Sequence, residues 1–130
     1  MKQTFSKEER LCSHRMISLL FSTGQTFHVK PFRVTWMRQS SAASSPVQVL
    51  ISVPKYNFHK AVERNLIRRR MREAYRLNKQ ILSACLAGTG NQVVFCMTYT
   101  AKEIMDYDLI QGKIILLLQR LKEANEKVTG

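Results

Sequence analysis

The sequence has 130 residues, of which 45% are hydrophobic, and its 21 Lys and Arg outnumber nine Asp and Glu to give a formal net charge of +12. This length fits one domain, and the hydrophobic content excludes wholesale disorder. The excess positive charge favours a polyanionic partner such as nucleic acid, although a soluble domain with an overcharged surface is the alternative.

The three cysteines, Cys12, Cys85 and Cys96, form no CxxC pair and show no zinc-ligand spacing. An odd number of widely spaced thiols suits a reducing compartment better than a disulfide framework. The N-terminus has no apolar run that would predict a signal peptide, and the longest apolar run, residues 114–118, is too short to span a bilayer. We therefore expect a cytoplasmic protein.

A short amphipathic helix is expected near the N-terminus. Residues 6–9 read SKEE, the S-x-x-E form of a capping box, and Ser13 offers a second cap before residues 14–21. The pattern leaves open one continuous helix or a turn followed by a shorter helix, and Gly24 is expected to end it. Three apolar residues at i, i+3 and i+4 spacing are expected to face a core: Ile17, Leu20 and Phe21.

Two strands are expected next. Residues 27–38 alternate apolar and polar side chains, which predicts a half-buried strand with Phe32 and Trp36 in the core. A small polar loop at about residues 39–46 is expected to be flexible. Residues 47–53 are apolar and rich in β-branched side chains, which favours a more central strand. We expect these two strands to pair antiparallel across the loop.

The most basic stretch spans residues 59–79 and is predicted to be a helix that continues to about Leu86, because it lacks Gly and Pro. Its apolar side is formed by Ile67, Met71, Ala74, Tyr75, Ile81 and Leu82. Its basic side is formed by Arg68, Arg69, Arg72, Arg76 and Lys79, with Asn65 among them. Since this side carries almost no acid, it favours phosphate binding over the alternative of a merely solvated face.

The remaining elements are a strand at residues 92–100 and a final helix that begins near Asp106 or Asp108 and frays at about residues 123–130. A strand, a long helix and a strand in succession predict a crossover that makes the two strands parallel neighbours. The order of helix, strands, helix, strand and helix predicts an α+β domain with one mixed sheet.

No self-sufficient catalytic set is visible in the sequence. The three histidines are far apart, and no nucleophile, zinc or phosphate-loop motif occurs. Asp106 and Asp108 are spaced to hold a magnesium ion, but helix capping explains the pair more simply. We therefore expect no catalytic residue and no metal ligand on the protein.

Residues 61–75, AVERNLIRRRMREAY, resemble the signature segment of the bacterial ribonuclease P protein family. The lead-in ISVPK at residues 51–55, the upstream Arg10-Leu11 and the spacing Phe21-x-x-Gly24 add to a resemblance that covers about residues 5–121.

The chain departs from the family pattern at three places. Leu66 stands where the family has an arginine, and Arg69 or Arg70 is a candidate to compensate for it. Ile17 occupies a position that is commonly aromatic, and the loop at residues 56–60 is one residue longer than usual.

The resemblance implies a single-domain α/β sandwich over residues 1–130, with a mixed four-stranded sheet flanked by about three helices. The implied order is αβββαβα, similar to the second domain of ribosomal protein S5, with a left-handed crossover around the basic helix. The implied activity is that of an endoribonuclease subunit. Together with the catalytic ribonuclease P RNA, which binds most of the Mg²⁺, it removes the 5′ leader of precursor tRNA.

The resemblance also implies two sets of site residues. The residues expected to contact RNA are Lys55, Lys60, Arg64, Asn65, Arg68, Arg69, Arg72 and Arg76. A cleft for the single-stranded leader is expected to contain Phe21, Arg33 and Thr35. Exposure of Phe21 and Tyr56 for base stacking stays open, and a structural RNA-binding protein such as a ribosomal component is the alternative function.

Overall fold

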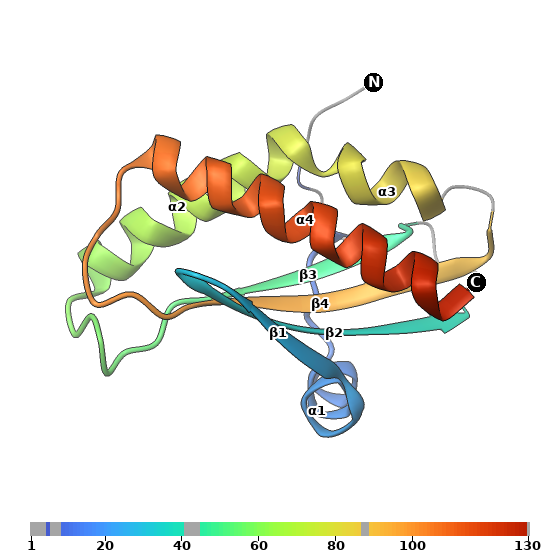
Figure 1. Ribbon diagram of the computed structural model, residues 1–130. Coiled ribbons are helices and arrows are strands. Elements are labelled where there is room, and N and C mark those ends of the chain that lie inside the picture. Colours follow the sequence, from blue (N-terminus) through green and yellow to red (C-terminus); the bar gives the residue numbers. More distant parts are fainter. Residues whose placement is uncertain (1–4, 6–8, 41–44, 87–88, 130) are drawn as a thin grey trace.

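The computed structural model describes residues 5, 9–40, 45–86 and 89–129, and it builds them around one four-stranded sheet (Figure 1). In chain order the elements are α1 (His14–Thr23), β1 (Gln25–Val29), β2 (Phe32–Ser40), β3 (Val47–Ser52), α2 (Ala61–Asn78), α3 (Gln80–Leu86), β4 (Asn91–Tyr99) and α4 (Tyr107–Thr129). Helices α2, α3 and α4 lie on one face of the sheet and α1 lies against the other (Figure 1). The predicted α+β class and mixed four-stranded sheet are confirmed.

The strands lie in the order β1-β2-β4-β3, with β3 parallel to β4 and the other neighbours antiparallel. The parallel neighbours predicted around the basic helix are therefore confirmed. The predicted antiparallel pairing of residues 27–38 with 47–53 is wrong, because β4 lies between β2 and β3. The side chains from Gln92 to Tyr99 are all buried, which suits β4 to the centre of a sheet that is covered on both faces.

The alternating stretch at residues 27–38 is divided between two strands. A turn at Lys30-Pro31 separates β1 from β2, and proline has no N–H to donate to a ladder. The Pro31 carbonyl accepts hydrogen bonds from the backbone N–H of Thr100 at 2.7 Å and from its hydroxyl at 2.9 Å. The hairpin is thereby tied to the end of β4. Of the predicted loop, residues 39 and 40 belong to β2, and residues 41–44 lie outside the described part of the chain.

Helix α1 is the shorter of the two helices that the sequence allowed. The hydroxyl of Ser13 accepts a hydrogen bond from the Met16 N–H at 3.3 Å, which confirms this cap, whereas residues 6–8 of the alternative cap lie outside the described residues. Gly24 ends the helix as predicted, and its N–H donates to the Leu20 carbonyl at 2.8 Å. A Cβ at position 24 would lie 2.4 Å from that oxygen, so a larger residue would force the turn apart.

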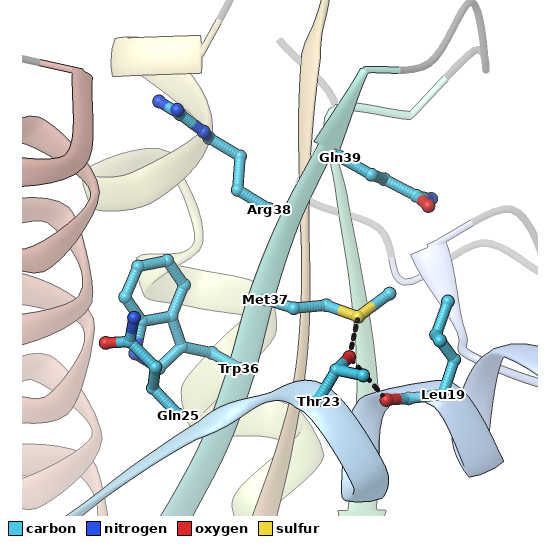
Figure 2. Close-up of a pocket in the computed structure, with 7 residues that line it drawn as sticks. All are labelled: Leu19, Thr23, Gln25, Trp36, Met37, Arg38 and Gln39. Atoms are coloured by element: carbon cyan, nitrogen blue, oxygen red, sulfur yellow. Dashed lines mark hydrogen bonds between the residues drawn. The ribbon is translucent and has the colours of Figure 1, made fainter.

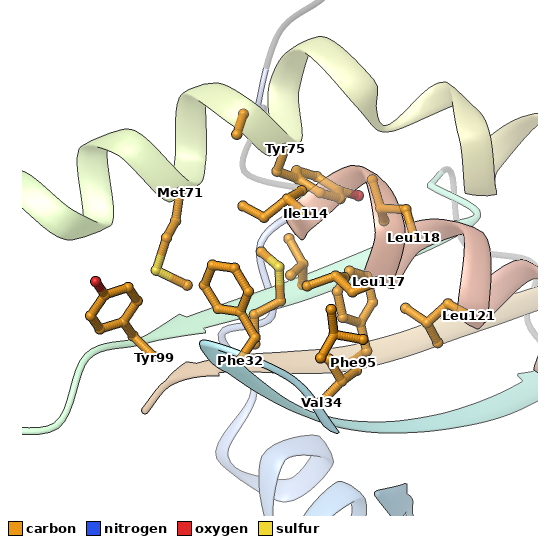
Figure 3. Close-up of a cluster of buried hydrophobic side chains, with 14 of the residues drawn as sticks. Phe32, Val34, Met71, Tyr75, Phe95, Tyr99, Ile114, Leu117, Leu118 and Leu121 are labelled. Carbon is orange, nitrogen blue, oxygen red and sulfur yellow. The ribbon is translucent and has the colours of Figure 1, made fainter. Parts of the chain in front are cut away.

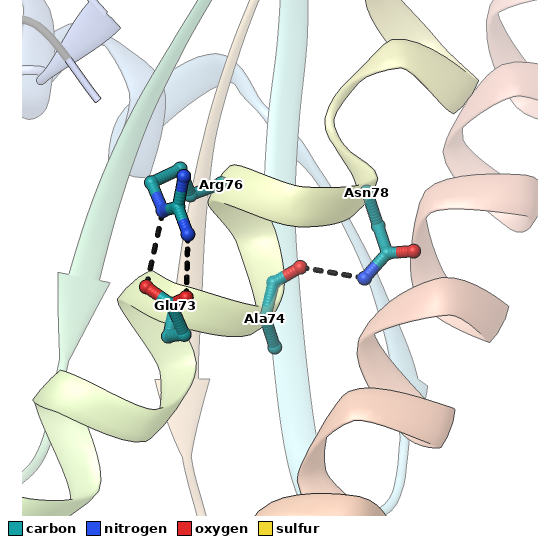
Figure 4. Close-up of polar contacts among 4 residues, drawn as sticks. All are labelled: Glu73, Ala74, Arg76 and Asn78. Carbon is teal, nitrogen blue, oxygen red and sulfur yellow. Dashed lines mark hydrogen bonds and ion pairs between the residues drawn. The ribbon is translucent and has the colours of Figure 1, made fainter. Parts of the chain in front are cut away.

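The predicted basic helix is interrupted at Lys79, which gives α2 and α3 and makes four helices in the described part of the chain. The last turn of α2 is closed by Asn78, whose side-chain amide donates to the Ala74 carbonyl at 2.8 Å (Figure 4). Helix α4 begins at Tyr107, close to the predicted start, and continues through Thr129 instead of fraying from about residue 123. Burial of Leu121 and Asn125 explains why this last part stays helical.

The main core fills the space between the sheet and helices α2 and α4 (Figure 3). The predicted apolar side of α2 is confirmed, since Ile67, Met71, Ala74 and Tyr75 are buried there. The rings of Tyr75 and Phe95 meet edge to face with centroids 6.1 Å apart. A smaller cluster lies on the other side of the sheet, beneath α1: Leu11, Leu20, Val94 and Cys96. Burial raises the pKa of the Cys96 thiol, as expected for a core residue.

A short segment before α1, which we call the strap (Phe5 and Glu9–Leu11), crosses the outer edge of β3. Arg10 forms a parallel β-bridge with Val49, and the Leu11 N–H donates to the Val49 carbonyl at 2.9 Å. Glu9 pairs with Lys79 at 2.5 Å, and these side chains are only 15% and 13% exposed. The strap therefore joins the layer of α2 to the opposite face of the sheet, where α1 begins.

Candidate nucleic-acid interface

The six arginines of α2 differ in whether their side chains form hydrogen bonds or ion pairs with other residues of the protein. Arg64 donates from Nη1 to the carbonyls of Phe58 and His59, each at 2.8 Å, and so fixes the loop before α2 to the helix. Arg70 donates to the carbonyl of Met105, in the loop before α4. Two of the six are therefore anchored on backbone carbonyls of neighbouring loops.

A third arginine of α2 forms an ion pair. Arg76 binds Glu73 through Nε at 3.0 Å and Nη2 at 2.6 Å (Figure 4). This hydrogen bonding lowers the pKa of the Glu73 carboxyl below its ordinary value. A guanidinium held in this way contributes less to an anionic partner than an uncompensated one, because the carboxylate already offsets its charge.

The other three arginines gather on one exposed side of α2. Arg69 and Arg72 are exposed, and Arg68 donates to the side-chain oxygen of Asn65 at 3.2 Å. We call Asn65, Arg68, Arg69 and Arg72 the docking face. Together with Val62 and Leu66 they line a shallow hollow of about 390 Å³, and no acidic residue is among its described lining.

Leu66 therefore lies within the hollow of the docking face rather than away from it. Of the two arginines considered as substitutes for a charge at this position, Arg69 lines the same hollow, whereas Arg70 is turned toward Met105. Of these two arginines, only Arg69 therefore lies where it could take the place of a charge at position 66.

The loop before α2 brings further polar side chains to the start of that helix. Lys55 and Lys60 are exposed, and Lys60 is the N-cap residue of α2 without a capping bond from its side chain. Tyr56 is 70% exposed, so its ring is available for stacking. Because Arg64 fixes this loop to α2, the backbone that carries the two lysines is held in place.

The residues expected in a leader cleft lie on the face of the sheet that carries α1. Phe21 was expected to face the core and is instead 53% exposed, because Leu20 takes the buried place beneath α1. Arg33 is exposed on β2, directly opposite exposed His28 on β1. Thr35 is only 7% exposed, and its hydroxyl lies 3.2 Å from that of Thr26. Phe21 and Arg33 are therefore accessible, and Thr35 is largely closed off.

Sequence reasoning missed His28 as a member of this surface. Its place follows from the register of the β1–β2 hairpin, which puts His28 beside Arg33 on the same face. The position of the turn at Lys30-Pro31 was the signal that would have revealed this pair.

A second hollow of about 400 Å³ lies where β2 extends beyond the start of β1 (Figure 2). Figure 2 shows Trp36 and Arg38 on one side of β2 and Met37 on the other, near Thr23 of α1. The Thr23 hydroxyl donates to the Leu19 carbonyl at 2.8 Å. Arg38 is the only ionisable side chain in the described lining, so this hollow offers no acid–base pair.

Neither a metal cluster nor a membrane-spanning helix is found in the part of the chain that the structure describes. No group of three His, Cys, Asp or Glu residues is placed to hold a metal ion among these residues. No helix within the same ranges is long and apolar enough to cross a bilayer. Cys12, Cys85 and Cys96 are free thiols.

The mixed sheet, its helices and the uncompensated arginines of α2 define a basic α+β protein of the nucleic-acid-binding class. The family model described as Ribonuclease P matches residues 5–122. Because this match spans most of the sequence, the chain belongs to the ribonuclease P protein family.

Individual relatives agree with this assignment. The Ribonuclease P protein component of Porphyromonas gingivalis is 34% identical over 106 residues, which cover 82% of this chain and 77% of the relative. That of Chlorobium phaeobacteroides is 29% identical over 126 residues, covering 89% and 86%. The solved RNase P protein from Thermotoga maritima has the same fold, with a TM-score of 0.67, 24% identity and coverage of 86% of this chain and 96% of that one. The chain is therefore a protein subunit of ribonuclease P, the endoribonuclease that processes tRNA.

Proposed function

We propose that the docking face binds the ribonuclease P RNA and that the surface around Phe21 and Arg33 holds the 5′ leader of precursor tRNA. The observation that carries the first part is the presence of three arginines around one hollow of α2 whose described lining holds no acidic residue. Planar guanidinium groups bind phosphate oxygens through paired, charge-assisted hydrogen bonds. Displacement of counterions from the RNA backbone adds to this affinity at moderate salt.

The second part of the proposal is supported by the exposed ring of Phe21. An unpaired base stacks on an accessible aromatic side chain, and a nearby cation holds the phosphate that follows it. Arg33 supplies such a cation, and His28 lies beside it across the hairpin. A single-stranded leader suits this combination better than an RNA duplex, whose bases are already stacked on one another.

We further propose that phosphodiester hydrolysis takes place on the RNA subunit and that the Mg²⁺ ions are bound mainly by RNA. In this arrangement the protein contributes by positioning the precursor and by offsetting phosphate repulsion where two RNAs meet. Lys55, Lys60 and Arg64 extend the positive potential around the docking face, whereas the charge of Arg76 is offset by Glu73. We also propose that the protein acts in the cytoplasm, where precursor tRNA is processed in a bacterium.

The proposal is tested by cleavage of precursor tRNA by a bacterial ribonuclease P RNA at low Mg²⁺, with and without the protein. Added protein is expected to stimulate leader removal, and the double variant Arg69→Ala/Arg72→Ala is expected to lose most of this effect. Lys122→Ala serves as the control, since Lys122 is an exposed cation of α4. RNA binding without any stimulation would favour a structural RNA-binding protein instead.

A further inference from the structure

A groove between the strap, β3 and α2 adjoins the docking face and shares two of its arginines. It has a volume of about 200 Å³, and we call it the strap groove. Three arginines form its basic part: Arg10 from the strap and Arg68 and Arg72 from α2. Its apolar lining includes Leu11, Leu50 and Ile51. The groove therefore combines guanidinium groups with an apolar floor in a space suited to a small, partly charged group.

The strap groove is held in shape by the contacts that fix the strap to the rest of the protein. The ion pair of Glu9 with Lys79 and the backbone bond of Leu11 to Val49 fix the strap against β3. The Arg10 guanidinium lies 6.0 Å from the centroid of the Phe5 ring, which keeps this cation over the strap. No acidic residue is among the described lining of the groove, and the neighbouring carboxylate of Glu9 is bound by Lys79. The charge of the groove therefore suits an anionic occupant.

We propose that the strap groove receives one unpaired nucleotide of the ribonuclease P RNA, with its base on the apolar floor and its phosphate between the arginines. Arg68 and Arg72 belong to both the docking face and the groove, so an RNA strand bound on α2 reaches the groove without a break. An unpaired nucleotide fits because its base is free to leave the strand, whereas a base in a duplex is not. This inference rests on the proposed binding of the ribonuclease P RNA by α2.

Cys12 offers a native reporter for the groove, because its exposed side chain is part of the lining. The full-length protein would be alkylated with N-ethylmaleimide, and the rates at Cys12 and Cys85 would be followed separately by mass spectrometry. With ribonuclease P RNA at ten times its dissociation constant, alkylation of Cys12 is expected to slow by about tenfold, since only free protein reacts. Cys85 lies on α3 and serves as the internal control, with an unchanged rate.

A variant of Arg10 tests the same inference through affinity. Arg10→Ala keeps the backbone bridge to Val49 and removes one cation from the groove. The magnitude of the slope of log affinity for ribonuclease P RNA against log salt is expected to fall by about 0.7 to 0.9, the value for one lost phosphate contact. Arg15→Ala is the matched control, because Arg15 is an exposed arginine of α1 that does not line the groove.

The outcomes separate this inference from the function on which it rests. Protection of Cys12 by precursor tRNA with its leader, but not by ribonuclease P RNA, would overturn the inference and assign the groove to the substrate. The inference would also be overturned if RNA does not slow alkylation of Cys12 and if Arg10→Ala keeps the wild-type salt slope. In that case, weaker RNA binding by Arg69→Ala/Arg72→Ala would still support the docking face. If that double variant also binds the ribonuclease P RNA with wild-type affinity, both the proposed RNA binding by the docking face and the inference about the groove are wrong.

Discussion

Arg72 and Arg76 lie on the same helix but differ in their partners, and they are therefore predicted to differ in their contribution to RNA binding. Arg72 is exposed on the docking face, whereas Arg76 is bound by Glu73 through two nitrogens. If Arg72 contacts one phosphate, Arg72→Ala lowers the magnitude of the log–log salt slope for ribonuclease P RNA by about 0.7 to 0.9. Over the decade from 1 M to 0.1 M salt this corresponds to about a five- to eightfold loss of affinity at 0.1 M.

The matched control is the double variant Glu73→Ala/Arg76→Ala, which removes the ion pair and leaves the net charge unchanged. It is expected to keep the wild-type slope, because Arg76 makes no phosphate contact on this reasoning. Binding would be measured by titrating labelled RNA at several salt concentrations, with thermal unfolding followed by circular dichroism to show that each variant is folded. Equal losses of slope in Arg72→Ala and in the double variant would refute the distinction between free and paired arginines.

Three further predictions concern the loop, the core and the leader surface. Arg64→Ala removes two hydrogen bonds to loop carbonyls, so the free energy of unfolding in urea should fall by about 1–3 kcal/mol and amide exchange at residues 54–60 should accelerate. Ile67→Ala, at a fully buried position, should cost about 2–5 kcal/mol in the same assay without changing the salt slope. Phe21→Ala should weaken binding of precursor tRNA by about 1–3 kcal/mol and leave binding of mature tRNA unchanged, because one stacked base is lost.

Each of these has an outcome that would contradict it. Unchanged amide exchange in Arg64→Ala would mean that the loop is held without this arginine. A reduced salt slope in Ile67→Ala would mean that the docking face depends on core packing. If Phe21→Ala weakened the binding of precursor and mature tRNA equally, the Phe21 ring would not contact the leader.

The sequence predicts α2 well because both of its faces are recorded in local spacing. Ile67 and Met71 repeat at helical intervals, and the structure buries both of them. The same spacing failed for Phe21, because α1 covers only a narrow part of the sheet and Leu20 alone occupies its centre. Periodicity gives the direction of a side chain on its helix, but the width of the partner surface decides whether that side chain is buried.

Strand pairing was the largest error, and its cause is also non-local. The hydrophobic pattern of residues 47–53 predicted a more central strand, which is wrong, because β3 lies at an edge of the sheet. The pattern does not identify the neighbours of a strand. β4 lies between β2 and β3, and its side chains, which are buried on both faces, suit an inner position in the sheet. The turn at Lys30-Pro31 then leaves β1 to occupy the other edge of β2.

The partners of individual arginines could be predicted from the sequence only where both residues lie on one helix. Charge clustering predicts one basic face on α2, yet the carbonyl partner of Arg70 belongs to Met105, 35 positions further along the chain. The pairing of Glu73 with Arg76 was accessible from sequence, because the two are three residues apart on a helix. Partners that approach through the fold, rather than along a helix, could not have been assigned from the pattern.

If the docking face and the surface around Phe21 bind RNA as proposed, one small sheet serves two RNAs from its two faces. The docking face belongs to α2 on one side of the sheet, and Phe21 belongs to α1 on the other (Figure 1). β4 is buried between both layers, and the strap crosses the edge of β3 from one layer to the next. A close-packed protein interior deforms little. An RNA bound on α2 would therefore be held at a fixed position relative to a leader bound near α1. Positioning of this kind assists a reaction whose catalytic groups lie on the RNA, since it limits the motion of the substrate before cleavage.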